Sequence, residues 1–196
     1  MLKNIILAGV GGQGILSIAA VIGEAALKEG WYMKQSEVHG MSQRGGDVQS
    51  HLRLSDKPIA SDLIPVGQAD IIISLEPMES LRYLPYLKKE GWLVTNSQPF
   101  INIPNYPDLQ AILDEIDKLP DKVILDVESI AKNIGSSQSA NMVMLGAATP
   151  FLGIDYDKIA DGIRTIFARK SDDIIQLNLK ALKAGYETTK IFFKNN

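Results

Sequence analysis

Three glycines near the start of the chain have the spacing of a backbone turn that holds an anion. Gly9, Gly11 and Gly14 fit the pattern G-x-G-x-x-G, between a short apolar run and a stretch with apolar residues at helical spacing. In such a turn the first glycine permits a tight bend, the second lets another group approach the backbone, and the third permits close helix packing. N–H groups at the start of the helix then face a phosphate or another anion. We therefore predict binding residues at Gly9, Gly11, Gly12, Gln13 and Gly14, with Gln13 either bonded to a ligand or capping the helix through its neighbours.

A second glycine-rich segment supplies polar side chains. Residues 39–46 contain His39, Ser42 and Arg44 and end in Gly45-Gly46. A guanidinium beside two glycines can bind a phosphate or carboxylate through two hydrogen bonds, or it can close an internal salt bridge. His39 suits proton transfer near neutral pH or a plain loop position, and the glycines suit either close ligand approach or an ordinary turn. We predict that His39, Ser42, Arg44, Gly45 and Gly46 belong to the binding site, and we assign no catalytic residue and no metal ligand.

The glycine turn leaves the nature of its ligand open. Binding of NAD(P) or FAD requires an acidic residue about 20 residues beyond the turn to hold the ribose, and Glu37 stands at roughly that distance from Gly14. A plain dinucleotide domain has no need of the polar segment 39–46 that follows. A turn without any ligand, or one approached by another anion or by a partner backbone, fits the same pattern.

Hydrophobic periodicity indicates which elements position these residues. Short apolar or alternating runs predict strands at 4–8, 32–37, 48–54, 70–75, 92–95 and 122–126. Apolar residues at helical spacing predict helices at 15–28, 77–84, 109–119, 141–151, 155–168 and 172–188. Gly91 is expected to lead into the strand that begins at Trp92.

Strands that alternate with helices predict a three-layer α/β/α, Rossmann-like α/β fold. The sheet is expected to be mainly parallel but mixed, because the 48–54 strand follows a short loop and should pair antiparallel with a neighbour. A helical C-terminal segment completes a single domain over residues 1–196. His51 falls on the polar phase of its strand, so we expect it to be exposed or at an interface.

Composition excludes several classes of protein. The 196 residues include 20 basic and 23 acidic side chains, for a net charge of −3, which argues against nucleic-acid binding driven by bulk charge. There is no cysteine, so the chain cannot supply the thiolates that hold iron–sulfur clusters. No apolar run is long enough to cross a membrane, and residues 1–8 lack the features of a signal peptide. We therefore expect a cytoplasmic protein.

Three blocks of sequence carry a resemblance to a known family. Residues 9–14 read Gly-Val-Gly-Gly-Gln-Gly, residues 37–46 read Glu-Val-His-Gly-Met-Ser-Gln-Arg-Gly-Gly, and residues 141–146 read Asn-Met-Val-Met-Leu-Gly. In this order they resemble the gamma-type subunit, or fused domain, of the 2-oxoacid:ferredoxin oxidoreductases. The second block is similar to the version typical of the beta subunit of indolepyruvate ferredoxin oxidoreductase.

The resemblance implies a division of labour between subunits. It implies one gamma-type catalytic domain over residues 1–196 that carries no cofactor of its own. Thiamine diphosphate and 4Fe–4S clusters would lie on an alpha subunit, ferredoxin would be reached through the complex, and coenzyme A would be a co-substrate that this chain helps to hold. The complete enzyme would oxidatively decarboxylate an aryl 2-oxoacid such as indolepyruvate to an acyl-CoA. An uncovered interface would also allow two copies of the isolated chain to pair.

Other functions stay open at this stage. Within the family, the substrate could be pyruvate or another 2-oxoacid. Outside it, Gly9, Gly11, Gly14 and Glu37 suit a stand-alone NAD(P)-dependent dehydrogenase, with His39 as its proton donor. A non-enzymatic scaffold domain that keeps the fold is the third reading.

Overall fold

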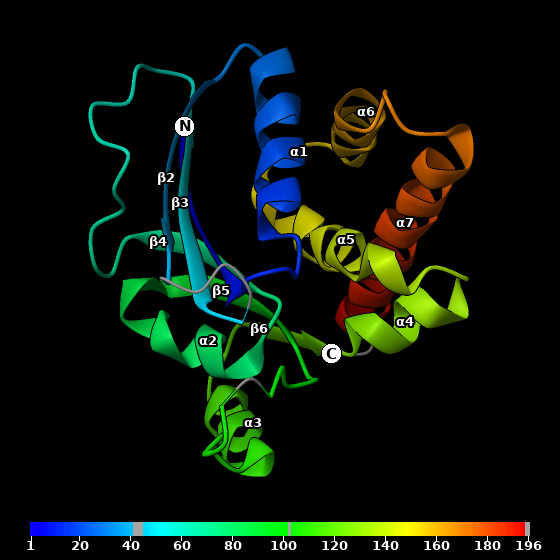
Figure 1. The fold of residues 1–196 in the computed structure, drawn as a ribbon. Helices are drawn as coiled ribbons and strands as arrows, with labels where there is room; N and C mark the ends of the chain where they lie inside the picture. Colours follow the sequence, from blue (N-terminus) through cyan, green and yellow to red (C-terminus); the bar gives the residue numbers. More distant parts are fainter. Residues whose placement is uncertain (41–44, 102, 195–196) are drawn as a thin grey trace.

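A single mixed sheet forms the centre of the computed structural model, which describes residues 1–40, 45–101 and 103–194, with side chains to residue 191 (Figure 1). The strands run in the order β2-β3-β1-β4-β5-β6. Strands β1, β4, β5 and β6 are mutually parallel, whereas β3 is antiparallel to both β1 and β2. The predicted mixed sheet and the antiparallel pairing of the 48–54 strand are therefore confirmed. The strands are β1 (Leu2–Val10), β2 (Tyr32–His39), β3 (Asp47–Ser55), β4 (Ala69–Ser74), β5 (Leu87–Asn96) and β6 (Lys122–Leu125).

Helices cover both faces of this sheet. Helices α1, α4, α5, α6 and α7 lie on one side and α2 and α3 on the other (Figure 1). Two 3-10 turns, η1 (Leu84–Tyr86) and η2 (Ser137–Ser139), join neighbouring elements. The helices are α1 (Ile15–Lys28), α2 (Pro77–Arg82), α3 (Leu109–Asp117), α4 (Val127–Asn133), α5 (Ala140–Leu152), α6 (Tyr156–Ile166) and α7 (Asp172–Lys194).

Alternating side chains of the strands build two separate cores. On β1, Ile5 and Leu7 belong to the larger core under α1 and α5, whereas Ile6 and Ala8 belong to the smaller core under α2 and α3. This is the period-2 alternation of a strand covered on both faces. The three-layer architecture predicted from the sequence is confirmed.

The expectation that His51 is exposed is wrong. His51 is only 5% exposed, because the segment between β3 and β4 folds back over the polar phase of β3. The Ile64 N–H donates to His51 Nδ1 at 2.9 Å, and the Arg53 guanidinium donates to the carbonyls of Ser61 and Leu63. Two of the alternating polar residues of β3, His51 and Arg53, thus bind a loop backbone instead of water.

Helices α5 and α7 pack backbone to backbone at two glycines. A Cβ on Gly146 would lie 2.0 Å from the Leu182 oxygen, and one on Gly185 would lie 1.9 Å from the Val143 oxygen. Thr189 Oγ1 adds a hydrogen bond of 3.1 Å to the Ala147 carbonyl. Close approach of this kind requires residues without a side chain at the crossing point.

Element boundaries agree with expectation except in β5 and α7. Helix α1 begins and ends at the predicted residues. Strand β5 begins at Leu87, not at Trp92, and Gly91 lies inside it next to a register shift against β4. A Cβ on Gly91 would lie 3.0 Å from the Ala69 oxygen, so this glycine permits an irregularity within the strand. Helix α7 continues past residue 188 to Lys194.

Candidate functional site

The glycine turn joins the carboxyl end of β1 to the start of α1, as predicted. Gly12 and Gly14 have φ angles of 102° and 85°, in the left-handed region that favours glycine. Gly14 is the N-cap of α1 and no side chain caps this helix, so its first N–H groups are available to an anion. A Cβ on Gly9 would lie 2.7 Å from Ile15 Cδ1, which shows that this glycine serves close packing.

The Gln13 side chain holds the turn together from inside. Its Oε1 accepts a hydrogen bond of 2.7 Å from the Val10 N–H, and its Nε2 donates one of 3.0 Å to the Leu75 carbonyl. Both ends of the amide are therefore occupied within the fold. The expectation that Gln13 caps the helix is wrong, because its side chain bonds Val10 and Leu75 and no side chain caps α1.

The two glycine-rich segments come together in space. The Gly11 N–H donates to the Gly46 carbonyl at 2.8 Å, and the Gly45 N–H reaches the Gly11 carbonyl at 3.5 Å. Gly45 has a φ of 79°. Ser42 and Arg44 lie outside the described residues, so their assignment to the site stays a prediction.

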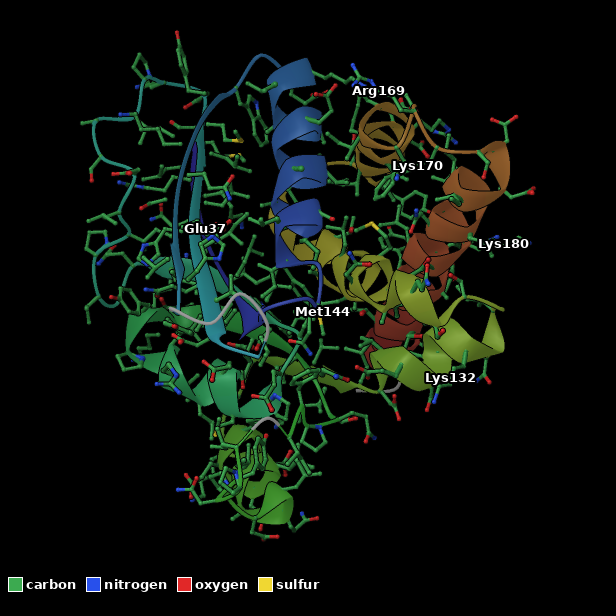
Figure 2. The ribbon with its side chains drawn as sticks, viewed as in Figure 1. Glu37, Lys132, Met144, Arg169, Lys170 and Lys180 are labelled. Carbon is green, nitrogen blue, oxygen red and sulfur yellow. The ribbon has the colours of Figure 1, made fainter. Side chains whose placement is uncertain are left out.

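A cavity of about 310 Å³ opens where these segments meet, and we call it the turn cavity. His39 contributes the polar side chain of its wall, and its Nε2 contacts the Glu37 carboxylate of the same strand; Glu37 is labelled in Figure 2. Leu16, one of the lining residues, is 49% exposed. The lining residues are Val10, Gly11, Gly12, Gly14, Ile15, Leu16, His39 and Val48.

Sequence reasoning missed a polar cluster at the carboxyl ends of β4, β5 and β6. The Asn96 amide donates to both Glu128 carboxylate oxygens, at 3.2 and 3.0 Å. Glu76 is fully buried, and its carboxylate accepts from the Glu79 N–H at 2.8 Å and from the Tyr106 hydroxyl. Glu76, Asn96 and Glu128 each come shortly after a predicted apolar strand in the sequence. That position could have predicted the cluster, because the carboxyl ends of parallel strands meet at one edge of a sheet.

Burial perturbs the titration of this cluster. Desolvation raises the pKa of the Glu128 carboxyl above its ordinary value, although the Asn96 hydrogen bonds act in the opposite direction. Burial also raises the pKa of the Tyr106 hydroxyl, and the neighbouring Glu76 carboxylate adds to that rise. Glu128 borders a second cavity of about 330 Å³, which shares Gly12 with the turn cavity and also contacts Gln13, Leu75 and Phe100.

The two cavities offer different chemical groups to a ligand. The turn cavity offers backbone N–H groups and His39, and the second cavity offers the Glu128 carboxyl as a proton acceptor or donor. In the part of the chain that the structure describes, no three His, Asp or Glu side chains are placed to hold a metal ion. None of the described helices is long and apolar enough to cross a membrane.

The strand order does not fit the dinucleotide reading. That reading needs an acidic residue at the end of the strand adjacent to β1, but β3 lies between β1 and β2. Glu37 stands opposite Ser50 on β3, one strand removed from Leu7. The Glu37 carboxylate, which would bind the ribose of a dinucleotide, instead contacts His39.

Comparisons with known proteins agree on one family. The family model described as pyruvate ferredoxin/flavodoxin oxidoreductase matches residues 4–188. The indolepyruvate oxidoreductase subunit IorB of Archaeoglobus fulgidus is 37% identical over 195 residues, which cover 95% of this chain and 94% of that protein. The common gamma subunit of the pyruvate/ketoisovalerate oxidoreductases of Pyrococcus furiosus is 28% identical, with 94% and 95% covered.

A solved structure shares the fold over nearly its full length. The gamma subunit of a keto/oxoacid ferredoxin oxidoreductase from Geobacter sulfurreducens superposes with a TM-score of 0.69 at 26% identity, and the match covers 96% of this chain and 99% of that one. The residues matched by the family model, 4–188, include both glycine-rich segments and the α5–α7 crossing. This chain belongs to the pyruvate ferredoxin/flavodoxin oxidoreductase family.

Proposed function

We propose that this chain is the cluster-free subunit of an indolepyruvate:ferredoxin oxidoreductase. Relatives that share more than a third of its residues over nearly its whole length are indolepyruvate oxidoreductase subunits. The observation that carries the proposal is the junction of the two glycine-rich segments through Gly11 and Gly46, which forms an open cavity lined largely by backbone and apolar groups. Such a surface binds and positions a ligand, and the oxidative decarboxylation takes place on another subunit.

The partner subunit supplies the redox and thiamine chemistry. Iron–sulfur clusters need cysteine thiolates, and this chain contains no cysteine, so the residues present do not fit a cluster. Thiamine diphosphate and the clusters therefore belong to an alpha subunit, which reduces ferredoxin. In the assembled enzyme, the N–H groups at the start of α1 and the side chains of His39, Ser42 and Arg44 face an anionic part of coenzyme A or of the 2-oxoacid.

The exposed apolar rim of the turn cavity gives the partner its contact. Leu16 lines the cavity and leaves about half of its surface in solvent, and an exposed apolar group beside a polar site is typical of an interface. In the complex this side chain packs against the alpha subunit and closes the cavity from one side.

Co-purification tests the assignment. The tagged chain, expressed in its native host, should bring down a large cysteine-rich, thiamine-dependent subunit, and the complex should reduce ferredoxin faster with indolepyruvate than with pyruvate or ketoisovalerate. A complex that prefers pyruvate would keep the family and overturn the substrate. A chain that purifies alone and reduces NAD with a 2-hydroxy acid would overturn the whole proposal.

A matched pair of glycine variants tests the cavity. Gly12 and Gly67 have φ angles of 102° and 73°, and a Cβ on either residue would meet no atom within 4 Å. Alanine at either position should therefore cost a similar amount of stability, about 1 kcal/mol. Only Gly12→Ala places a methyl group at the turn cavity, so only that variant should weaken partner binding or raise the KM for a substrate. Equal behaviour of the two assembled enzymes would contradict a role for the turn.

A further inference from the structure

A third cavity, of about 310 Å³, lies within the helical layer on one side of the sheet. It is enclosed by the first turn of α1, the start of α5, the α6–α7 junction and the first half of α7. Polar groups from three of these elements line it, among them Ser17, Ser139, Asn141 and Asn178. We call this space the helix cavity.

Asn178 is a buried amide without a partner. It is 6% exposed and lines the helix cavity from α7. Its side chain makes no hydrogen bond to any of the residues that the structure describes. A buried amide normally has its hydrogen bonds satisfied, so Asn178 is set to bond something that occupies the cavity.

The electrostatics of the helix cavity favour a negative occupant. Helix α5 begins there, and its N-cap residue Ser139 makes no capping bond, because its hydroxyl pairs with Ser136 Oγ at 2.8 Å. The start of a helix carries a partial positive charge, although one of the first N–H groups of α5, that of Met142, already donates to Asn141 Oδ1 at 2.9 Å. Lys170 adds a full positive charge, and no Asp or Glu is among the lining residues. Figure 2 places Lys170 between α6 and α7.

One wall of the same cavity is apolar. Phe167, Ile174 and Leu177 line it from the α6–α7 junction and α7, and Ile174 is 41% exposed. A free inorganic ion would leave this wall without a partner. A ligand with an anionic head and an organic body would cover both walls.

We propose that the helix cavity binds the phosphoryl group of an organic phosphate ester. The head accepts hydrogen bonds from the Asn178 amide, the first N–H groups of α5 and the Lys170 ammonium, and the ester's organic part lies against Phe167 and Ile174. Helix starts and lysine side chains are regular phosphate binders in proteins. This site is separate from the turn cavity and does not depend on the substrate of the assembled enzyme.

Calorimetric titration of the full chain tests the proposal. Adenosine monophosphate is the probe, with inorganic phosphate, adenosine and acetate at matched ionic strength as comparisons. Asn178→Asp replaces the amide donor with a negative charge at nearly the same shape, and it should weaken adenosine monophosphate binding by at least about 10-fold, as expected for loss of a hydrogen bond to a charged group. Lys170→Gln should weaken it to a similar or smaller extent.

Lys180→Gln is the matched control. It removes the same charge from α7, which begins two residues after Lys170, but Lys180 does not line the helix cavity, and its side chain is labelled on the outer side of α7 in Figure 2. It should leave the affinity unchanged. Because Lys170 is exposed, Lys170→Gln should fold normally and keeps the test decisive if Asn178→Asp does not fold.

The outcomes separate the sources of the anion. Tighter binding of adenosine monophosphate than of inorganic phosphate supports an ester, and equal binding supports a site for phosphate alone, which would overturn the organic part. Binding of acetate or adenosine as tight as that of adenosine monophosphate would overturn recognition of a phosphoryl group. Binding that survives both Asn178→Asp and Lys170→Gln, or the absence of any binding, would also overturn the proposal.

Discussion

Two amide side chains hold the glycine turn in place. The Gln13 amide connects the end of β1 to the end of β4 through Val10 and Leu75. The Asn141 amide, at the start of α5, donates to the Gly14 carbonyl at 3.2 Å. The backbone that forms the turn cavity is therefore fixed by two other elements of the fold, which pre-organises its N–H groups for an anion.

Replacing Gln13 by Glu should show that its role is structural. The carboxylate keeps the acceptor for the Val10 N–H but loses the donor to the Leu75 carbonyl and places two oxygens face to face. We expect a loss of about 1–3 kcal/mol in the free energy of unfolding, measured by urea denaturation. Gln176→Glu, at an exposed position of α7, is the control and should remain close to wild type. Equal stability of the two variants would contradict a structural role for the Gln13 amide.

Buried His51 should make stability depend on pH. Burial lowers the pKa of the folded imidazole below its ordinary value of 6.5. The unfolded chain therefore takes up a proton first as the pH falls. The stabilisation is complete above about pH 6.5 and declines as the pH falls through that value towards the folded pKa, with a slope of at most about 1.4 kcal/mol per pH unit.

Two histidine variants check this pH dependence. His51→Gln keeps an acceptor for the Ile64 N–H and should flatten the decline in unfolding free energy between pH 7.5 and about pH 5.5. His39→Gln changes a histidine whose side chain is 56% exposed, and it should keep the decline. If the unfolding free energy of His51→Gln declines as steeply as that of the wild type, titration of other groups causes the pH dependence.

The sequence reveals the binding backbone more readily than the buried polar groups. Glycine spacing is local, so Gly9 to Gly14 and Gly45-Gly46 are visible as motifs, although their junction through Gly11 and Gly46 depends on tertiary contact. Glu76 and Glu128 meet at one edge only because β4, β5 and β6 are neighbours. The burial of His51 could not be predicted, because the sequence of its strand gives no indication of the loop that covers it. An exposed or interface position is the expectation that this strand supports.

At the scale of elements, the crossing of α5 and α7 sets the spacing of the helical layer. Gly146→Ala would place a Cβ 2.0 Å from the Leu182 backbone oxygen, and two helices would have to separate. We expect a loss of about 2–3 kcal/mol, in the range of overpacked cores. The midpoint of thermal unfolding measures it.

Gly23→Ala is the matched control within another buried helix. A Cβ on Gly23 would meet the sulfur of Met33 at 2.4 Å, but a methionine side chain is flexible and can move aside. Alanine also favours helix by up to about 1 kcal/mol over glycine. Gly23→Ala should thus be near neutral, and a loss as large as that of Gly146→Ala would show that backbone contact is not what makes position 146 sensitive.

Periodicity located the elements well where one face or phase is consistently apolar. Helix α1 and strands β1, β3, β4 and β6 follow that rule closely. The first half of β5 does not, because Lys88, Lys89 and Glu90 precede a glycine, and the pairing with β4 that extends the strand is a tertiary effect. Nor can sequence alone pair Gly146 with Gly185, since each glycine by itself only weakens a helix.

At the scale of the whole molecule, function depends on the surface around the turn cavity meeting a partner. Arg44→Ala should leave the isolated chain folded, because a single charged side chain in a glycine-rich, polar stretch of sequence seldom carries core stability. It should lower the activity of the assembled enzyme with its 2-oxoacid and coenzyme A. Circular dichroism of the chain and steady-state kinetics of the complex are the measurements, and unchanged kinetics would count against a binding role for Arg44.

The α5–α7 crossing also governs when the protein can finish folding. Helix α5 is buried almost throughout, and α7 supplies the backbone that fills the space at Gly146. Because α7 follows α5 in the sequence, the side of α5 that α7 covers stays open to solvent until α7 has folded onto it. A chain whose α7 is detached therefore exposes an apolar helix to chaperones and to aggregation.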